Sequence, residues 1–161
     1  MANDPRMDEL EALYRDRHSH FVRVARALVG SPEAAHDVVQ DAFAAAVRSR
    51  HDFRGEGPLE AWLWRILVNR ARATSRERPT AGLVGQEAAS ARRNGAHAGN
   101  VLAAVAALPE RQRLAVFLRY YADLDYRSIA AALGVEVGTV SATLHAAHAA
   151  LRRLLTEEVT G

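Results

Sequence analysis

The fold is decided near the carboxyl end of the chain, where residues 126–144 read YRSIAAALGVEVGTVSATL. Apolar residues at its start recur with the spacing of one helix face up to Leu133. Gly134 is suited to end that helix, because glycine adopts the left-handed backbone conformation without strain. Val140 and Leu144 then continue the helical spacing in a longer segment. A short helix, a turn that starts with glycine and a longer helix together predict a helix-turn-helix.

Three more helices are predicted in the first half of the chain. Apolar residues recur at three-, four- and seven-residue intervals in the first of them, which ends at Gly30. Ser31 and Pro32 begin the second, since serine caps a helix amino terminus and proline fits the first turn. The third begins at Leu59 and cannot continue past Pro79.

The sequence therefore predicts an all-α chain, with two small helical domains joined by a flexible linker. The first domain is expected to span residues 1–78, and the second, with the helix-turn-helix, residues 100–161. Between them, residues 79–99 are rich in Gly, Ala, Ser, Asn and Gln and show no sustained apolar spacing, which is typical of a tether. Helices of the second domain are predicted over 101–108, 109–121, 126–133 and 137–155.

Composition excludes several classes of function. The 161 residues include no cysteine, which excludes disulfides and thiol chemistry. No apolar stretch approaches the roughly 18 to 20 residues that cross a bilayer, so a cytoplasmic protein without membrane insertion is expected. The formal net charge is only +2. The protein is therefore not a polycation that coats nucleic acid indiscriminately.

Two sets of motifs, in the expected order, resemble one known family. In the second half, LPERQR (108–113), LRYY (118–121), LGV (133–135) and GTV (138–140) resemble the promoter-binding carboxyl-terminal domain of extracytoplasmic-function (ECF) RNA polymerase sigma factors. In the first half, HDVVQDAF (36–43) is similar to the helix with which that family binds core polymerase. WLWRILVN (62–69) is similar to its helix for promoter melting and minus-10 recognition.

The resemblance assigns core-polymerase binding to Asp37, Gln40 and Asp41. At helical spacing these polar residues fall on the face opposite Val39 and Phe43. They would offer carboxylates and an amide to a partner instead of to the core. Taken without the surrounding motif, the same pattern is typical of a solvated polar helix face.

The resemblance assigns minus-10 recognition and melting to the third predicted helix and the loop before it. Polar residues of that helix lie in a narrow arc at about 100° per residue, which makes one face a cationic ladder able to grip phosphates. Nearby aromatic rings could stack an unpaired base, and Gly55 and Gly57 would let the loop backbone approach a flipped base. Core packing is the alternative for the tryptophans, and solvated surface is the alternative for the arginines. The candidate residues are Phe53, Arg54, Trp62, Arg65, Asn69, Arg72 and Arg76.

Minus-35 recognition is assigned to the helix-turn-helix, with a notable departure from the family. The family commonly places Lys or Arg at recognition-helix positions that here include Ala146 and Ala150. Each phosphate contact adds affinity through counterion release, so weak autonomous binding to the minus-35 element is expected. The candidate contacts are Arg127, Ser128, Thr139, Ser141, Ala142, Thr143 and His145.

The leading hypothesis is a sigma factor that binds core RNA polymerase and directs transcription initiation at promoter DNA. It is expected to catalyse no reaction and to need no cofactor or metal, since the sequence has no catalytic set or phosphate loop in a recognisable context. An anti-sigma factor is a further partner that the sequence leaves open.

Two alternatives remain open. A degenerate sigma-like protein would bind polymerase or an anti-sigma partner without reading the minus-35 element. A free-standing helix-turn-helix regulator would bind operators without polymerase, usually as a dimer that reads paired half-sites. The first domain would then have no evident purpose.

Overall fold

The computed structural model describes residues 3–77 and 97–160. The first domain opens with α1 (Pro5–Val29) and α2 (Pro32–Arg48). Gly30 ends α1 with φ 86°, and its N–H donates to the carbonyl of Arg26 over 2.9 Å. The predicted start of α2 is confirmed, because the Ser31 hydroxyl accepts a hydrogen bond from the amide of Ala34.

A short 3₁₀ helix, η1 (Arg50–Asp52), and a loop lead into α3 (Leu59–Glu77). Arg50 ties this corner to the start of the chain, with Nε 2.6 Å from Oδ2 of Asp4. That hydrogen bond, which Arg50 donates, holds the pKa of Asp4 below its ordinary value. Phe21 of α1 lies in the centre of the three-helix core, where its ring contacts Phe43 and Trp64.

The second domain contains α5 (His97–Ala106), α6 (Glu110–Tyr120), α7 (Tyr126–Leu133) and α8 (Val137–Thr160). Helix α5 begins at His97, so residues 97–99 are helical where a linker was expected. The rest of that linker, 79–96, lies outside the described residues.

The helix-turn-helix forms as predicted. Asp125 caps α7 by accepting a hydrogen bond from the amide of Ser128 over 2.8 Å, and this bond lowers the pKa of Asp125. Gly134 ends α7 with φ 68°, which glycine adopts without the strain of a side chain. Val140, Leu144 and Ala147 then bury one face of α8 against the rest of the domain.

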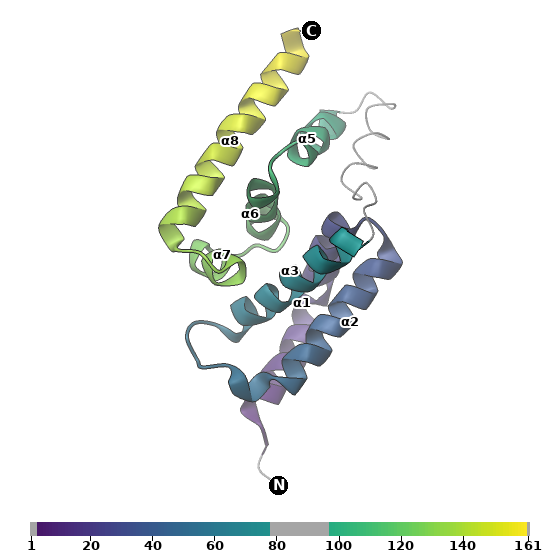
Figure 1. The fold of residues 1–161 in the computed structure, drawn as a ribbon, viewed down its shortest axis with the longest axis vertical. Coiled ribbons are helices and arrows are strands. Elements are labelled where there is room, and N and C mark those ends of the chain that lie inside the picture. The colour runs from purple at the N-terminus through teal and green to yellow at the C-terminus, as the bar shows by residue number, and fades with distance from the viewer. Residues whose placement is uncertain (1–2, 78–96, 161) are drawn as a thin grey trace.

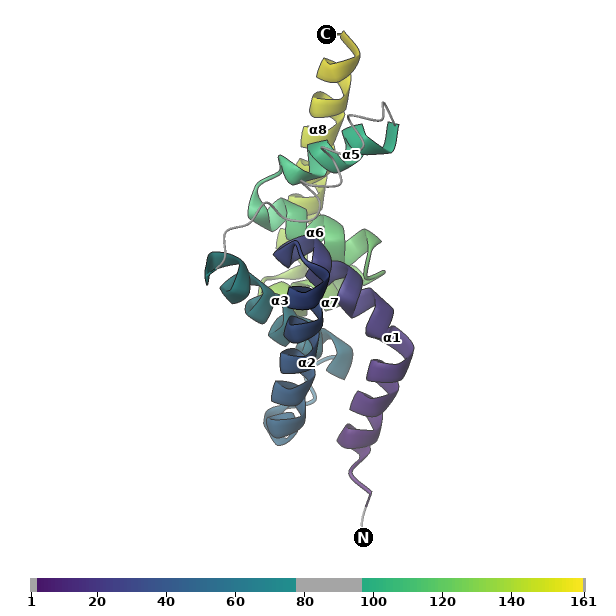
Figure 2. The same cartoon turned by 90° about the vertical axis from the view of Figure 1, so that its right-hand side faces the viewer.

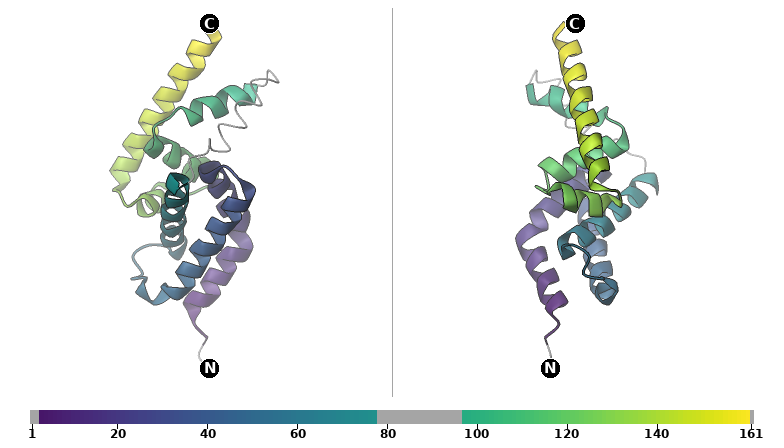
Figure 3. Two further views of the ribbon diagram at one scale, coloured as in Figure 1. Left: turned by 45° about the vertical axis from the view of Figure 1, so that its right-hand side comes forward. Right: turned by 90° about the vertical axis from the view of Figure 1, so that its left-hand side faces the viewer.

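The two domains lie against each other. Helix α7 packs along α3, and α6 touches α1 (Figures 1 and 2). The views in Figure 3 show the bundle of α1, α2 and α3 at one end of the molecule and α8 extending away from it. The prediction of an all-α protein is confirmed over the described residues, which contain no strand.

Within 3–77 and 97–160, no single helix is long and apolar enough to cross a membrane. Helices α7 and α8 reach that threshold only when taken together across their turn, where they are bent by 100°.

Candidate functional site

Helix α2 presents a polar face to solvent. Asp37, Gln40 and Asp41 are exposed, while Val39 and Phe43 are buried, as the helical spacing predicts. Neither carboxylate makes an ion pair with another described residue, so both are available to a partner.

The structure adds residues of α1 and α2 to this face that the sequence did not indicate. The hydroxyl of Tyr14 accepts a hydrogen bond from Nε2 of Gln40 over 3.1 Å. The His18 ring contacts Tyr14, and its centroid lies 6.2 Å from that of His36. The contacts of Gln40 with Tyr14 and of His36 with His18 join α2 to α1, so no pattern within one helix could show them.

Helix α3 carries the predicted cationic ladder. Arg65, Asn69 and Arg76 are exposed and Arg72 is half-buried. The opposite face of the helix packs into the core through the buried side chains of Leu63, Leu67 and Ala71.

The two tryptophans of α3 have different environments. Trp64 is fully buried, and its ring centroid is 4.3 Å from that of Phe21. Trp62 is half-buried at the surface, where it contacts Phe53 with ring centroids 5.5 Å apart. Core packing therefore accounts for Trp64, and the pair formed by Trp62 and Phe53 offers aromatic surface beside the cationic ladder.

The loop before α3 leaves space around its glycines. Gly55 and Gly57 have φ of 77° and 90°, and a Cβ added at either would meet nothing within 4 Å. Their positive φ angles favour glycine, and the open surroundings leave this stretch of backbone accessible to a ligand.

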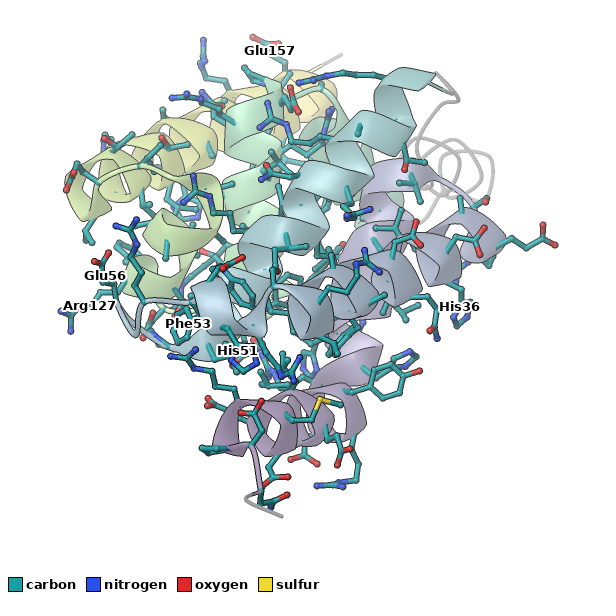
Figure 4. The ribbon with its side chains drawn as sticks, turned by 60° about the horizontal axis from the view of Figure 1, so that its bottom comes forward. His36, His51, Phe53, Glu56, Arg127 and Glu157 are labelled. Carbon is teal, nitrogen blue, oxygen red and sulfur yellow. The ribbon has the colours of Figure 1, made fainter. Side chains whose placement is uncertain are left out.

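A cavity of about 790 Å³ lies between this loop and the helix-turn-helix. The first domain lines it with Phe53, Arg54, Trp62 and Arg65, four of the predicted minus-10 residues. The second domain lines it with Gly134, Val135 and Glu136 of the turn, and with residues of α7. Figure 4 shows Phe53, Glu56 and Arg127 on one side of the molecule and His36, at the start of α2, on the other.

The outward face of α8 is small and uncharged, as the sequence predicts. Thr139, Ser141, Ala142 and His145 are exposed, and Thr143 is half-buried. A groove of about 490 Å³ joins this face to the start of α6, where Arg111 and Gln112 line its other wall. Arg111, which belongs to the LPERQR motif but is not among the predicted minus-35 contacts, is thus an exposed cation beside the recognition helix.

The two candidate minus-35 contacts at the start of α7, Arg127 and Ser128, differ in their exposure to solvent. Arg127 is exposed, but Ser128 is only 9% exposed. Its amide is held by the Asp125 cap. Ser128 was a candidate contact to minus-35 DNA, and its burial leaves little of its side chain at the surface. Ser128 instead stabilises the start of α7 through the hydrogen bond from its amide to Asp125.

Polar contacts between the domains were also missed at the level of sequence. Nε of Arg72 lies 2.7 Å from Oε1 of Glu110, an ion pair between α3 and α6. Arg17 pairs with Glu60 within the first domain over 2.7 Å, and it donates a hydrogen bond across the domains to the carbonyl of Ala122. The partners of these contacts are 38 to 105 positions apart, and nothing in either local pattern indicates the other.

The sequence matches known families over both domains. Residues 13–78 match the family model for Sigma-70 region 2, and residues 98–151 match that for Sigma-70, region 4. The RNA polymerase sigma-E factor of Streptomyces coelicolor is 33% identical over 153 residues, which cover 91% of this chain and 86% of the relative. The ECF RNA polymerase sigma-E factor of Escherichia coli K12 is 34% identical, with 71% of this chain and 70% of the relative covered.

A solved structure agrees with the fold of the whole chain. CnrH, in complex with the cytosolic domain of CnrY, superposes with a TM-score of 0.72 at 26% identity. The match covers 94% of this chain and 90% of CnrH. Both domains and their order therefore have counterparts among known proteins, and the chain belongs to the extracytoplasmic-function sigma factors of the sigma-70 family.

Proposed function

We propose that this sigma factor selects promoters mainly through its first domain, residues 1–78. The observation that carries the proposal is the division of surfaces in that domain. A carboxylate face on α2 is free of ion pairs with described residues. The cationic ladder of α3 is a second exposed surface beside the pair of Phe53 and Trp62, and Figure 4 shows Phe53 on the opposite side of the molecule from His36 of α2. One domain can thus hold polymerase and a DNA strand at the same time.

Core RNA polymerase would be bound by Asp37, Gln40 and Asp41 on α2. Carboxylates at the surface of a helix form short, charge-assisted hydrogen bonds with arginine or lysine of a partner. The hydrogen bond from Gln40 to Tyr14 fixes the amide at the edge of this face. The arrangement leaves Asp37 and Asp41 to make the charged contacts.

The melted minus-10 strand would lie along α3 and the loop before it. Arg65, Asn69, Arg72 and Arg76 would contact phosphates and base edges, since guanidinium groups bind phosphate with two parallel hydrogen bonds. Phe53 and Trp62 would stack an unpaired base, a contact that tolerates any base because every base has a flat face. Arg54 lines the cavity between this loop and the helix-turn-helix, together with Phe53 and Trp62, and would add a cation there.

The second domain, residues 100–161, would bind duplex DNA upstream, but weakly. The exposed face of α8 offers hydroxyl groups from Thr139 and Ser141, close packing at Ala142, and His145. Thr143 lies at the edge of this face, and Arg127 of α7 supplies a cation beside it. Few phosphates are neutralised in this way, so the affinity and its salt dependence would both be small.

Run-off transcription with purified core polymerase on genomic templates tests this function. The expected result is a set of specific transcripts that require the chain, which acts by binding and catalyses nothing itself. Failure to bind core polymerase would contradict the proposal. Core binding without any specific transcript would instead favour a degenerate sigma-like protein.

A second candidate function is regulation through a protein partner. The related CnrH was solved with the cytosolic domain of another protein, CnrY, bound to it. An anti-sigma factor acting on this chain in the cytoplasm would cover the α2 face, the α3 ladder or both. Co-purification of a bound protein that blocks transcription, and is released to restore it, would identify such a partner.

A further inference from the structure

The start of α1 lies against the corner between α2 and α3 that contains η1, at the same end of the molecule (Figure 1). Arg50 of η1 donates a hydrogen bond from Nε to Oδ2 of Asp4 over 2.6 Å. In the other direction, Nη1 of Arg6 donates to the backbone carbonyl of Arg50 over 3.0 Å. The first turn of α1 therefore holds both the side chain and the backbone of one residue in this corner.

Asp4 links the corner to the helix itself. It caps α1, and its Oδ1 accepts a hydrogen bond from the amide of Arg6 over 3.1 Å. Its other oxygen binds Arg50, and Nε2 of His51 lies 4.0 Å from the same atom. One carboxylate therefore fixes Arg6 on one side and η1 on the other.

Arg6 also reaches the aromatic ring that follows η1. Its Cζ lies 5.9 Å from the centroid of the Phe53 ring, a distance at which a cation is attracted to the face of a ring. Trp62 contacts the same ring, with centroids 5.5 Å apart. The loop beyond Phe53 is open around Gly55 and Gly57, where an added Cβ would meet nothing within 4 Å. The position of the Phe53 ring therefore depends on Arg6 as well as on Trp62.

We propose that Asp4 and Arg6 are positioning residues for minus-10 recognition, because they hold Phe53 where it can stack an unpaired base. The inference rests on the proposed function, since it assumes that Phe53 stacks the base. It adds a contribution from a segment outside residues 13–78, the part of the chain that matches Sigma-70 region 2. None of the site residues predicted from the sequence precedes Asp37.

These contacts lie at the surface of the domain, so their loss is expected to alter the site without unfolding the protein. The side chains of Asp4 and Arg50 are 28% and 27% exposed, and partly exposed ion pairs contribute little to the free energy of unfolding. The core of the domain is instead built around Phe21, Phe43 and Trp64. Experiment can therefore separate a positioning role from a structural one.

The test uses holoenzyme assembled from core polymerase and the full chain, on a promoter identified by genomic run-off transcription. 2-Aminopurine in the non-template strand of the minus-10 element reports unstacking of the base when the promoter opens. The test variant is Arg6→Ala. Arg6→Lys is the conservative variant, since it keeps a cation that can donate to the Arg50 carbonyl. The control is Arg23→Ala, which removes an exposed arginine nearer the other end of α1.

Arg6→Ala is expected to lower the equilibrium constant for promoter opening by about fivefold, and Arg6→Lys by less. Arg23→Ala is expected to leave it unchanged. Because Arg6 acts through Phe53, Arg6→Ala should add little to the loss already caused by Phe53→Ala. Asp4→Asn keeps a helix cap and is expected to show the same dependence on Phe53. Core binding, measured by fluorescence anisotropy, is expected to stay the same in every variant.

Unchanged opening in Arg6→Ala, or equal losses in Arg6→Ala and Arg23→Ala, would overturn the proposal. A loss of the same size with and without the Phe53 ring would also overturn it, since Arg6 would then act on DNA or on stability directly. If Phe53→Ala itself leaves opening unchanged, the proposed strand site is wrong, which distinguishes the two failures. Asp4→Asn provides the same comparison if Arg6→Ala does not fold.

Discussion

Trp62 and Trp64 are two positions apart in α3, and their environments assign them opposite roles. Trp62→Ala removes an aromatic surface that is half-buried, so it is expected to reduce promoter opening strongly while lowering the free energy of unfolding by only about 1 kcal/mol. Permanganate reactivity of promoter thymines measures opening, and urea denaturation measures stability.

Trp64→Ala is expected to do the reverse, because Trp64 is fully buried against Phe21. Loss of a buried aromatic side chain costs about 3–5 kcal/mol, so urea denaturation should show a large loss of stability. If both variants lost stability equally and neither changed opening per folded molecule, the assignment of Trp62 to the strand site would be wrong.

Asp125 makes the stability of α7 depend on pH. Its pKa is lowered because its carboxylate accepts a hydrogen bond from the amide of Ser128. A lowered pKa in the folded state stabilises the protein above the ordinary pKa of aspartate, and this contribution is lost as the pH falls below about 4. Asp125→Asn keeps a cap but cannot titrate.

Thermal unfolding is measured for Asp125→Asn and the parent protein from pH 7 to pH 3. As the pH falls, the stability of the parent should decrease more than that of the variant. Asp125→Ala, without a cap, should be less stable by about 1 kcal/mol at pH 7. A parallel pH profile for the parent and the Asn variant would contradict this account of the cap.

For single residues, the sequence predicts exposure or burial correctly where it depends only on the position of the side chain around its own helix. The exposure of Asp37 and Asp41 and the burial of Val140 follow from helical spacing alone. The burial of Ser128 was missed, because a small polar residue in the first turn of a helix fits a cap or a surface equally well. The ion pair between Arg72 and Glu110 depends on how two domains meet, which no local spacing contains.

Among the helices, α2 is the element whose proposed role is easiest to isolate. Asp41→Arg is expected to weaken binding to core polymerase by about tenfold or more, because a like charge opposite a basic partner is strongly unfavourable. Fluorescence anisotropy of labelled protein titrated with core polymerase measures the affinity. Glu9→Arg, an exposed charge reversal on α1, serves as the control. Equal losses in both variants would point to net charge and not to this face.

Helix α8 allows the opposite experiment, in which missing charges are added. Ala142→Arg and His145→Arg place cations on its exposed face. Each new phosphate contact is expected to steepen the plot of log affinity against log salt concentration by about 0.9 for duplex DNA. Ser19→Arg on α1 controls for charge alone. An unchanged slope would show that this face of α8 does not meet DNA.

The ends of the helices show how far an element can be read from sequence. Gly30, Ser31 and Gly134 act through local backbone geometry, and the helices that they bound begin or end where predicted. Helix α5 starts at His97, four residues before the predicted Val101. The sequence did not predict this start, because His97, Ala98 and Gly99 offer neither a cap nor an apolar period.

On the scale of the whole molecule, the arrangement of domains could not be predicted from the sequence. The motifs predict two domains in this order, and residues 13–78 match Sigma-70 region 2 while residues 98–151 match Sigma-70, region 4. The packing of α7 along α3 brings residues of 126–133 against residues of 59–77, and the ion pair of Arg72 with Glu110 joins α3 to α6. Such contacts leave no periodic signal in either segment.

The central claim is that the first domain dominates promoter choice, and one measurement tests it most directly. A promoter identified by genomic run-off transcription is rebuilt with its minus-10 or its minus-35 element scrambled, and initiation is measured with core polymerase and this chain. The account predicts that scrambling the minus-10 element abolishes specific transcription, while scrambling the minus-35 element lowers it only a few-fold. Loss of transcription on scrambling the minus-35 element, with the minus-10 change tolerated, would contradict it.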